Sequence, residues 1–400
     1  MDDIFEKEMQ KDTVFLDRNV LSSHYIPDTL PHREREIEKI MKTLSPALKG
    51  KPPRNLFIYG KTGTGKTSTT KHVIEKLLQV KDKYKVGVDS IYINCRMLNT
   101  KYQVLLKCAE FCNPRKNFIG FPFSVLLDTV IDYTRTGKTN FIIVLDEIDK
   151  VKNLDDLVYS LTRANEVLET GHMEIIGITN NVTFKKELDP RSRSALLEDE
   201  IVFPPYNAEQ LQAIVKQRVK LGFKDRVMSD AAANLASALA AQESGDARYA
   251  LNLILKAGEI ADDDGLKKIG ENEVTRARKK VEEEIVYDVI AGLPEHQKIV
   301  LYAIALLTLE GSHYHRLDGT GDERVLFSGE VYEKYESICR DMDNTSKSAR
   351  WVREYINELD MQGLITISLS GKGVRGNTTL IRLAFPAEKV KEVIEKKLER

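Results

Sequence analysis

The first half of the chain alternates short apolar runs with amphipathic segments, the pattern of strands that alternate with helices. Intervening helices are expected at residues 32–44, 68–80, 100–112, 124–135 and 155–168. Five strands are expected at residues 56–59, 90–94, 141–145, 174–179 and 201–203. The run at 141–145 is apolar throughout, as in a parallel strand covered on both faces. This half therefore predicts an α/β, doubly wound parallel sheet, with Pro46 ending or kinking the first helix.

After Pro204 and Pro205 the strand pattern stops, and helical periodicity predicts a small helical domain with helices at 208–221, 229–242, 247–261 and 271–284. Further helices at 297–309, 328–340 and 346–362 precede two apolar runs, 364–370 and 378–383, joined by a glycine-rich turn. Helices followed by such a hairpin predict a winged helix-turn-helix. The expected domains are residues 1–205, 206–285 and 286–400.

Composition and charge exclude little. The chain has 60 Lys and Arg against 61 Asp and Glu, a net charge of −1, so only a local basic face could attract nucleic acid. The apolar run 301–309 is too short to cross a bilayer, and the N-terminus lacks a signal-type apolar stretch. The four cysteines form no C-x-x-C pair. We therefore expect a cytoplasmic protein with free thiols and no membrane partner.

The most specific motif lies between the first predicted strand and the helix that begins at Ser68. It matches G-x-x-x-x-G-K-(S/T) and reads Gly60-Lys61-Thr62-Gly63-Thr64-Gly65-Lys66-Thr67. The glycines let the backbone turn its N–H groups toward phosphates, and the following helix adds its positive end. Lys66 is expected to reach the β- and γ-phosphates, and the Thr67 hydroxyl is expected to ligate Mg²⁺.

Two acidic residues follow the apolar run 141–145, at the strand edge where ligands bind in α/β sheets. Asp146 is expected to hold Mg²⁺, and Glu147 to polarise the water that attacks the γ-phosphate. An isolated acidic pair is as well explained by capping of the next helix. The upstream phosphate loop favours the catalytic interpretation.

Two further polar residues have alternative explanations. Asn180 follows the run 174–179, where it either orients the attacking water or serves a turn. Arg248 opens a helix directly after Asp246, the expected N-cap. A cation is slightly disfavoured at a helix N-terminus, so Arg248 is either the partner of an anion such as ATP or a surface residue.

Together these motifs resemble one family. Segment 25–34, the phosphate loop, Asp146-Glu147, Thr179-Asn180, segment 189–191 and segment 245–248 occur in the order seen in archaeal replication initiators. These AAA+ ATPases are akin to the largest subunit of the origin recognition complex and to the cell-division-cycle helicase loader. The resemblance covers nearly the whole chain. It implies ATP or ADP with Mg²⁺, weak ATP hydrolysis as a switch, and as partners double-stranded origin DNA, the replicative helicase and, as a further candidate, another initiator subunit.

The resemblance also implies roles for matching positions. Lys66 and Thr67 would belong to Walker A, Asp146 and Glu147 to Walker B, Asn180 would be sensor 1 and Arg248 sensor 2. The adenine pocket would be lined by the segment that contains Tyr25, Pro27 and Arg33. Without the family, Arg33 is expected on a solvated face. Either Arg191 or Arg193 would be offered to a neighbour's nucleotide.

DNA contact is expected mainly from the C-terminal domain. Between residues 345 and 383, six cations oppose three acidic residues, which gives a net charge of +3 in a chain of −1. Cations on one face of the expected helix 346–362 fit a recognition helix in the major groove, namely Lys347, Arg350 and Arg353. Lys372 and Arg375 on the glycine-rich turn would reach phosphates or the minor groove. The alternative is a solvated helix with a protein-binding wing.

Two aromatic features accompany these cations. Trp351 is expected in the core. Segment 113–123 falls where the family inserts an element that touches DNA, and Lys116 with its neighbouring phenylalanines suits that contact. A loop held by buried phenylalanines is the alternative.

Three functions are compatible with these motifs. The first is an ATP-switched initiator that binds origin DNA and helps load the replicative helicase. The second is an ATP-regulated transcription factor or signalling switch with the same domain order. The third, a clamp-loader-like ATPase, is weakened by the predicted winged helix.

Overall fold

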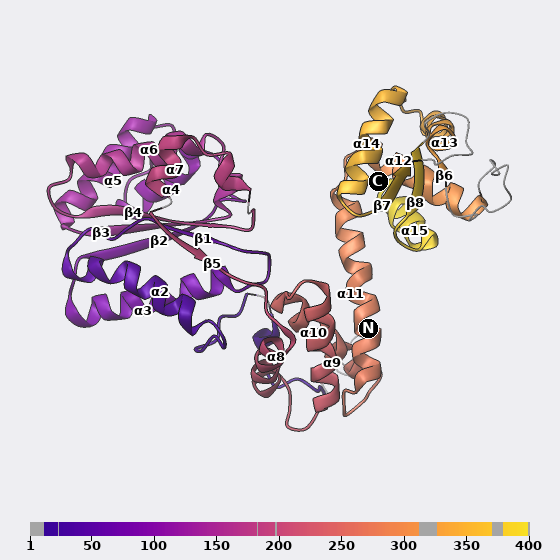
Figure 1. Cartoon of the computed structure of the whole chain (residues 1–400), viewed down its shortest axis with the longest axis horizontal. Coiled ribbons are helices and arrows are strands. Elements are labelled where there is room, and N and C mark those ends of the chain that lie inside the picture. Colours follow the sequence, from indigo (N-terminus) through magenta and orange to yellow (C-terminus); the bar gives the residue numbers. More distant parts are fainter. Residues whose placement is uncertain are drawn as a thin grey trace. The chain divides into compact units, whose positions relative to one another are not determined.

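The structure, a computed structural model, describes residues 12–22, 24–181, 183–196, 198–311, 326–369 and 379–398. The chain divides into two units, Met1–Ala277 and Arg278–Arg400 (Figure 1). The domain boundaries expected after residues 205 and 285 stay predictions. The glycine-rich turn with Lys372 and Arg375 lies outside the described residues.

A five-stranded parallel sheet forms the centre of the first unit, in the order β2-β3-β4-β1-β5. Its strands are β1 (Leu56–Tyr59), β2 (Val88–Asn94), β3 (Asn140–Asp146), β4 (His172–Thr179) and β5 (Asp199–Val202). Because the strands are parallel, their carboxyl ends share one edge, where Asn94 pairs with Asp146 and Tyr59 with Thr179. The predicted fold class is confirmed.

Helices cover both faces of this sheet (Figure 1). On one face lie α2 (Glu34–Leu44) and α3 (Lys66–Tyr84). The other face carries α4 (Lys101–Cys112), α5 (Phe123–Gly137), α6 (Leu154–Ala164) and α7 (Pro190–Leu196). All seven residues of β3 are buried, as the apolar run predicts for a strand covered on both sides. Helix α2 ends two residues before Pro46, as predicted.

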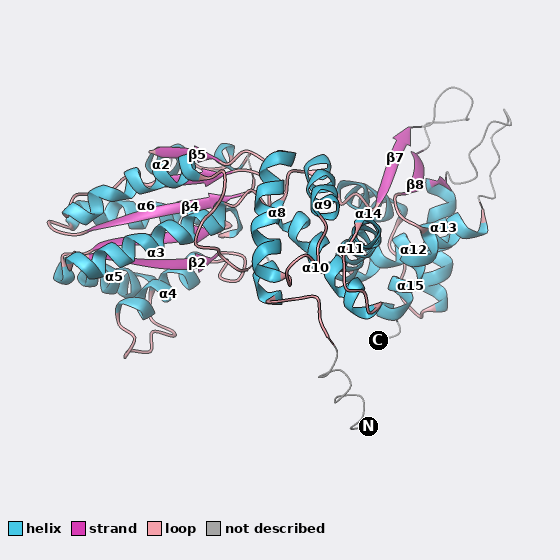
Figure 2. Cartoon of the chain, turned by 90° about the horizontal axis from the view of Figure 1, so that it is seen from below, coloured by secondary structure: helices cyan, strands magenta, loops and turns pink. Residues whose placement is uncertain are grey.

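The segment after β5 is helical (Figure 2) and comprises α8 (Ala208–Gly222), α9 (Asp230–Glu243), α10 (Ala247–Asp263) and the start of α11 (Glu271–Gly292). Side chains at the N-caps explain where these helices begin. Asn207 Oδ1 accepts from the Gln210 backbone N–H at 2.9 Å, and Asp246 Oδ1 accepts from the Arg248 backbone N–H at 2.7 Å. The expected N-cap role of Asp246 is thereby confirmed.

The second unit has the helices and sheet of a winged helix, as predicted. Its elements after α11 are α12 (Glu295–Glu310), β6 (Leu326–Phe327), α13 (Ser328–Asp341), α14 (Ala349–Met361), β7 (Ile365–Leu369), β8 (Thr379–Leu383) and α15 (Ala387–Leu398). The antiparallel sheet has the order β6-β8-β7.

Two elements of this unit were not predicted, and one residue lies elsewhere than predicted. Strand β6 has only two residues, and α15 is rich in Lys and Glu, so its buried Val390 and Ile394 give a weak pattern. The expectation that Trp351 is core is wrong, because its side chain is 55% exposed. The buried stripe of α14 is formed instead by Val352, Ile356 and Leu359.

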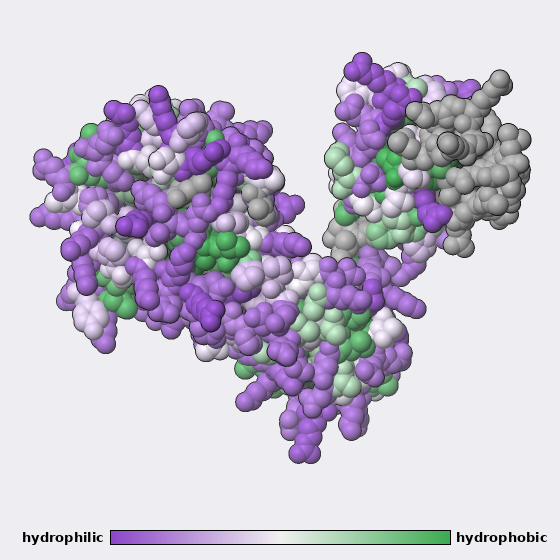
Figure 3. Space-filling model, viewed as in Figure 1, coloured by the Kyte–Doolittle hydropathy of each residue, from purple (hydrophilic) through white to green (hydrophobic). Residues whose placement is uncertain are grey.

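The surface of the molecule is mainly polar, as expected when most apolar side chains are buried. Most of the face in Figure 3 is hydrophilic, with hydrophobic residues in small scattered groups. In the part of the chain that is described, every helix is too short or too polar to traverse a lipid bilayer.

Candidate functional site

The phosphate loop, residues 60–67, joins β1 to α3 and is packed tightly against the helical segment. Gly63 and Gly65 have φ values of 66° and 87°, in the left-handed region that favours glycine. A Cβ on Gly63 would lie 1.6 Å from Asp246 Oδ1, and a Cβ on Gly65 would lie 2.8 Å from the Tyr206 hydroxyl. Both positions therefore require glycine for the backbone turn and for the approach of the next segment.

Lys66 lies over this loop and is poorly compensated. Its Nζ donates to the carbonyl oxygens of Gly60 and Lys61 at 2.8 and 2.7 Å. Burial, and next the charge of Arg248, lower the pKa of Lys66 to about 8. The hydrogen-bond acceptors of this buried ammonium are neutral carbonyls, and the carboxylates of Asp146 and Asp246 compensate its charge only in part. The ammonium is therefore suited to bind an anion.

Asp146 collects hydrogen bonds at the end of β3. The Thr67 hydroxyl donates to its Oδ2 at 2.8 Å, the Tyr92 hydroxyl bonds the same oxygen, and the Glu147 backbone N–H donates to Oδ1 at 3.0 Å. Burial, with the Asp146 charge as a further cause, raises the pKa of Tyr92, so this phenol stays a donor. A carboxylate beside a hydroxyl is the oxygen donor set that Mg²⁺ prefers. Tyr92 was not predicted, because it lies within an apolar strand run.

Glu147 and Asn180 lie at the same sheet edge. Glu147 has a φ of 55°, a left-handed backbone conformation that is uncommon for residues other than glycine. Such a conformation costs on the order of 1–3 kcal/mol, and residues that adopt it are found preferentially at active sites. Asn180 is exposed directly after β4, where Ile178 pairs with Asp146 of the neighbouring strand. The adjacent Thr179 donates to Asp149 at 2.6 Å. Glu147 and Asn180 thus follow the ends of two neighbouring strands, β3 and β4.

One pocket of the first unit brings together several predicted ligand-binding residues, namely Tyr25, Pro27, Gly63, Gly65, Thr67, Ser68 and Arg248. Other lining residues of this pocket were not predicted, namely Tyr206, Ile214, Gln217, Arg218 and Leu251. Three of these share one face of α8, at the helical spacing of 214, 217 and 218. That spacing was visible in the sequence, but nothing in it marks the face as facing a ligand.

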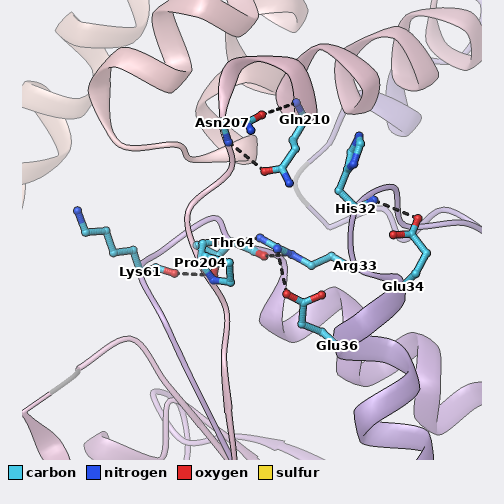
Figure 4. Close-up of polar contacts among 9 residues, drawn as sticks. All are labelled: His32, Arg33, Glu34, Glu36, Lys61, Thr64, Pro204, Asn207 and Gln210. Carbon is cyan, nitrogen blue, oxygen red and sulfur yellow. Dashed lines mark hydrogen bonds and ion pairs between the residues drawn. The ribbon is translucent and has the colours of Figure 1, made fainter.

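Arg33 is buried and hydrogen-bonded, which overturns one of the two expectations for it. The side chain is only 1% exposed, so a solvated position is wrong. Its Nε donates to the Thr64 carbonyl at 2.9 Å, one Nη donates to the Pro204 carbonyl at 2.7 Å, and the other pairs with Glu36 at 3.3 Å (Figure 4). Its guanidinium also stacks 3.9 Å from the Tyr206 ring centre. Arg33 is not among the described residues that line the pocket named above. Its predicted role in binding adenine stays a prediction.

Two other predicted contact points are exposed on the first unit. Arg191 and Arg193 lie in α7, whose start is fixed by Asp189 Oδ1 accepting from the backbone N–H groups of Arg191 and Ser192, both at 2.8 Å. Lys116 lies 5.1 Å from the ring centre of Phe118, which is fully buried. The loop is therefore held by a buried phenylalanine while its lysine faces solvent.

On the second unit, the three cations predicted on α14 and the turn before it are exposed, namely Lys347, Arg350 and Arg353. Neither Arg350 nor Arg353 forms an ion pair with another described residue. They lie away from the buried stripe of α14. The first turns of α14 therefore offer these two guanidinium groups to solvent.

Comparison with known proteins agrees with this organisation. The AAA ATPase domain model matches residues 29–113, the Cdc6 AAA+ ATPase-type lid domain matches residues 212–279, and the CDC6 C-terminal winged helix domain matches residues 288–393. The ORC1-type DNA replication protein of Thermococcus onnurineus is 43% identical over 403 residues, which covers 98% of this chain and 94% of the relative. The chain belongs to the ORC1-type DNA replication protein family.

Other ORC1-type relatives agree. The protein of Pyrococcus furiosus is 41% identical over 98% of this chain and 93% of its own length. The solved structure of the Aeropyrum pernix ORC1 protein in complex with DNA is 35% identical, with a TM-score of 0.82 over 96% of this chain and 97% of that chain. The predicted resemblance to archaeal replication initiators is confirmed, and the AAA ATPase domain implies that this ORC1-type chain binds and hydrolyses ATP.

Proposed function

We propose that this chain is an ATP-dependent replication initiator that binds origin double-stranded DNA and helps recruit or load the replicative helicase. The observation that carries the proposal is one chain that joins an ATPase core to a winged helix with free cations on α14. In the core, Lys66, Thr67 and Asp146 converge around the phosphate loop. The Aeropyrum pernix ORC1 protein, whose structure is in complex with DNA, supports DNA binding by its relatives.

At the phosphates, Lys66 would exchange its two carbonyl acceptors for phosphate oxygens, and Arg248 would add a second positive charge from α10. Thr67 and Asp146 would hold Mg²⁺, which when bound neutralises phosphate charge. Glu147 would polarise the attacking water, and Asn180 on the adjacent strand would orient it. Hydrolysis is proposed to be weak and to act as a switch between the ATP and ADP states.

Two unpaired side-chain atoms support adenine as the base. Arg218 Nε and Gln217 Oε1 are buried without a hydrogen-bond partner among the described residues, and both side chains line the pocket with Tyr25 and Pro27. Adenine offers an acceptor at N7 and a donor at N6, whereas guanine offers two acceptors on that edge. One free donor beside one free acceptor is therefore complementary to adenine.

DNA would be contacted chiefly by the winged helix. Helix α14 would enter the major groove, with Arg350, Arg353 and the preceding Lys347 on the phosphates that flank it. Lys372 and Arg375 would reach phosphates or the minor groove. Lys116 would supply a contact from the ATPase unit. Arg191 or Arg193, both exposed on α7, would serve the nucleotide of another initiator subunit.

Footprinting on the host's origin DNA, with ATP and separately with ADP, tests this function. We expect a protected, sequence-specific site in at least one nucleotide state. No protected site in either state would remove the initiator role. Genome-wide mapping of bound sites is the companion measurement, because enrichment at promoters instead of origins would identify a transcription factor.

A further inference from the structure

The chain's only tryptophan is in an unexpected place. Trp351 is the third residue of α14 and is 55% exposed, although exposure of so large an apolar ring is unfavourable in water. It shares the first turns of the helix with Arg350 and Arg353. At about 100° per residue, the ring lies beside Arg350 on the exposed side of α14 and on the opposite flank from Arg353. It therefore adds apolar surface next to the Arg350 end of the helix that we propose meets DNA.

The ring is held in place by a series of aromatic side chains. Trp351 lies 6.3 Å from Tyr355, one helical turn on, and Tyr355 stacks at 6.4 Å on His296 with an interplanar angle of 3°. The Tyr335 hydroxyl is 2.9 Å from His296 Nδ1 and accepts from the Lys347 backbone N–H at 3.0 Å. The fully buried Tyr335 thus anchors both the rings and the turn before α14. An ordered aromatic group loses little conformational entropy when it binds a partner.

Its position on the helix indicates what such a ring would meet. In helix-turn-helix proteins, the N-terminal residues of the second helix contact base edges in the major groove. The apolar group that a base presents there is the C5-methyl of thymine. A phosphate would be recognised by the neighbouring arginines instead, without regard to sequence.

We propose that Trp351 is a sequence-reading residue whose indole packs against the C5-methyl of a thymine in the major groove. The proposal rests on the DNA-binding function proposed above. Burying one methyl group corresponds to about a fourfold change in affinity, confined to the base pair that carries it. Loss of an arginine–phosphate contact would instead weaken binding to every sequence.

The test begins with selection of preferred duplexes from a random pool by the full chain with ATP and Mg²⁺. Each thymine of the selected duplex is then replaced singly by deoxyuracil, which lacks only the methyl group, and affinity is measured by fluorescence anisotropy. We expect one thymine whose replacement weakens wild-type binding about fourfold and leaves Trp351→Ala unaffected. Arg353→Ala is the matched control, which should bind all duplexes more weakly and keep the uracil effect.

Two further readouts separate the outcomes. Because Trp351 is the chain's only tryptophan, its emission must change when wild-type protein is saturated with the duplex. Unchanged emission, or equal uracil effects in wild type and Trp351→Ala, would overturn the proposal while leaving DNA binding intact. If Trp351→Ala binds all duplexes more weakly by the same factor, the ring contacts the sugar–phosphate backbone, which would also overturn the proposal.

Failure of the wild-type protein to bind any duplex would remove the proposed function itself. Matching thermal melting curves establish that Trp351→Ala is folded.

Discussion

The nucleotide site and the α14 face hold their charged groups in opposite ways. Around the phosphate loop, the polar atoms of Lys66, Thr67 and Asp146 form hydrogen bonds with one another or with the backbone. The loop and the start of α10 pack so closely that a single added carbon at Gly63 would clash with Asp246. On α14, Arg350 and Arg353 stand in solvent without ion pairs to described residues. The nucleotide would thus bind to a preorganised site, whereas DNA would bind to solvent-exposed arginines on a helix that is itself packed in the core.

The largest expected effect is loss of nucleotide binding in Lys66→Ala. Removing the buried ammonium deletes charge-assisted contacts to phosphate, so ATP affinity should fall by about 3 kcal/mol, more than 100-fold. Calorimetry with ATP and Mg²⁺ measures this loss. Lys76→Ala is the matched control, because it removes an exposed cation from the same helix, α3, outside the phosphate loop, and its ATP affinity should be unchanged. Equal affinity of Lys66→Ala and wild type would refute the assignment.

The next effect concerns the tight packing that distinguishes the nucleotide site. Gly63→Ala and Gly120→Ala both place alanine at positive φ, which costs about 1–2 kcal/mol. Only at Gly63 does the new Cβ clash, with Asp246, so this variant should lose a further 1–3 kcal/mol or so of unfolding free energy. Urea unfolding compares the two variants. Equal losses would show that the approach of α10 to the loop is not rigid.

A third prediction uses the lowered pKa of Lys66. With a free-state pKa of about 8, the ammonium is already charged below pH 7, so ATP affinity should be flat there. Above pH 8 the free protein loses this proton, and phosphate must bind with proton uptake, so affinity should fall toward about tenfold per pH unit. Calorimetry in two buffers with different heats of ionisation at pH 8.5 reports the proton directly. Constant affinity from pH 7 to 9.5 would mean that Lys66 keeps its proton.

The smallest effect is expected where charge is free. Arg353→Ala should weaken DNA binding by about 1 kcal/mol on all sequences and reduce the slope of log affinity against log salt by about one. Lys396→Ala, which removes a cation of α15 that pairs with Glu392, is the control and should change neither quantity. Anisotropy titrations at several salt concentrations measure both. A loss confined to one base pair would contradict a phosphate contact.

Each region could be predicted only in part from the sequence. Strands β1 to β5, the phosphate loop and the acidic pair were predicted, because apolar runs and a backbone-shaping motif are local signals. Tyr92 and Arg218 were not, since their roles depend on which distant segments pack beside them. Trp351 was placed in the core on its chemistry alone, although the helical stripe through Val352 and Ile356 leaves it outside. Long-range packing is what the local patterns lacked.

The central claim is that one chain combines an ATP-binding core with a sequence-selective DNA-binding domain. Its most direct test is fluorescence anisotropy with saturating ATP and Mg²⁺, comparing a labelled origin duplex with a scrambled duplex of equal length and composition. We predict that the origin duplex binds at least about 10³-fold more tightly at physiological salt. Equal affinity for the two duplexes would contradict the account.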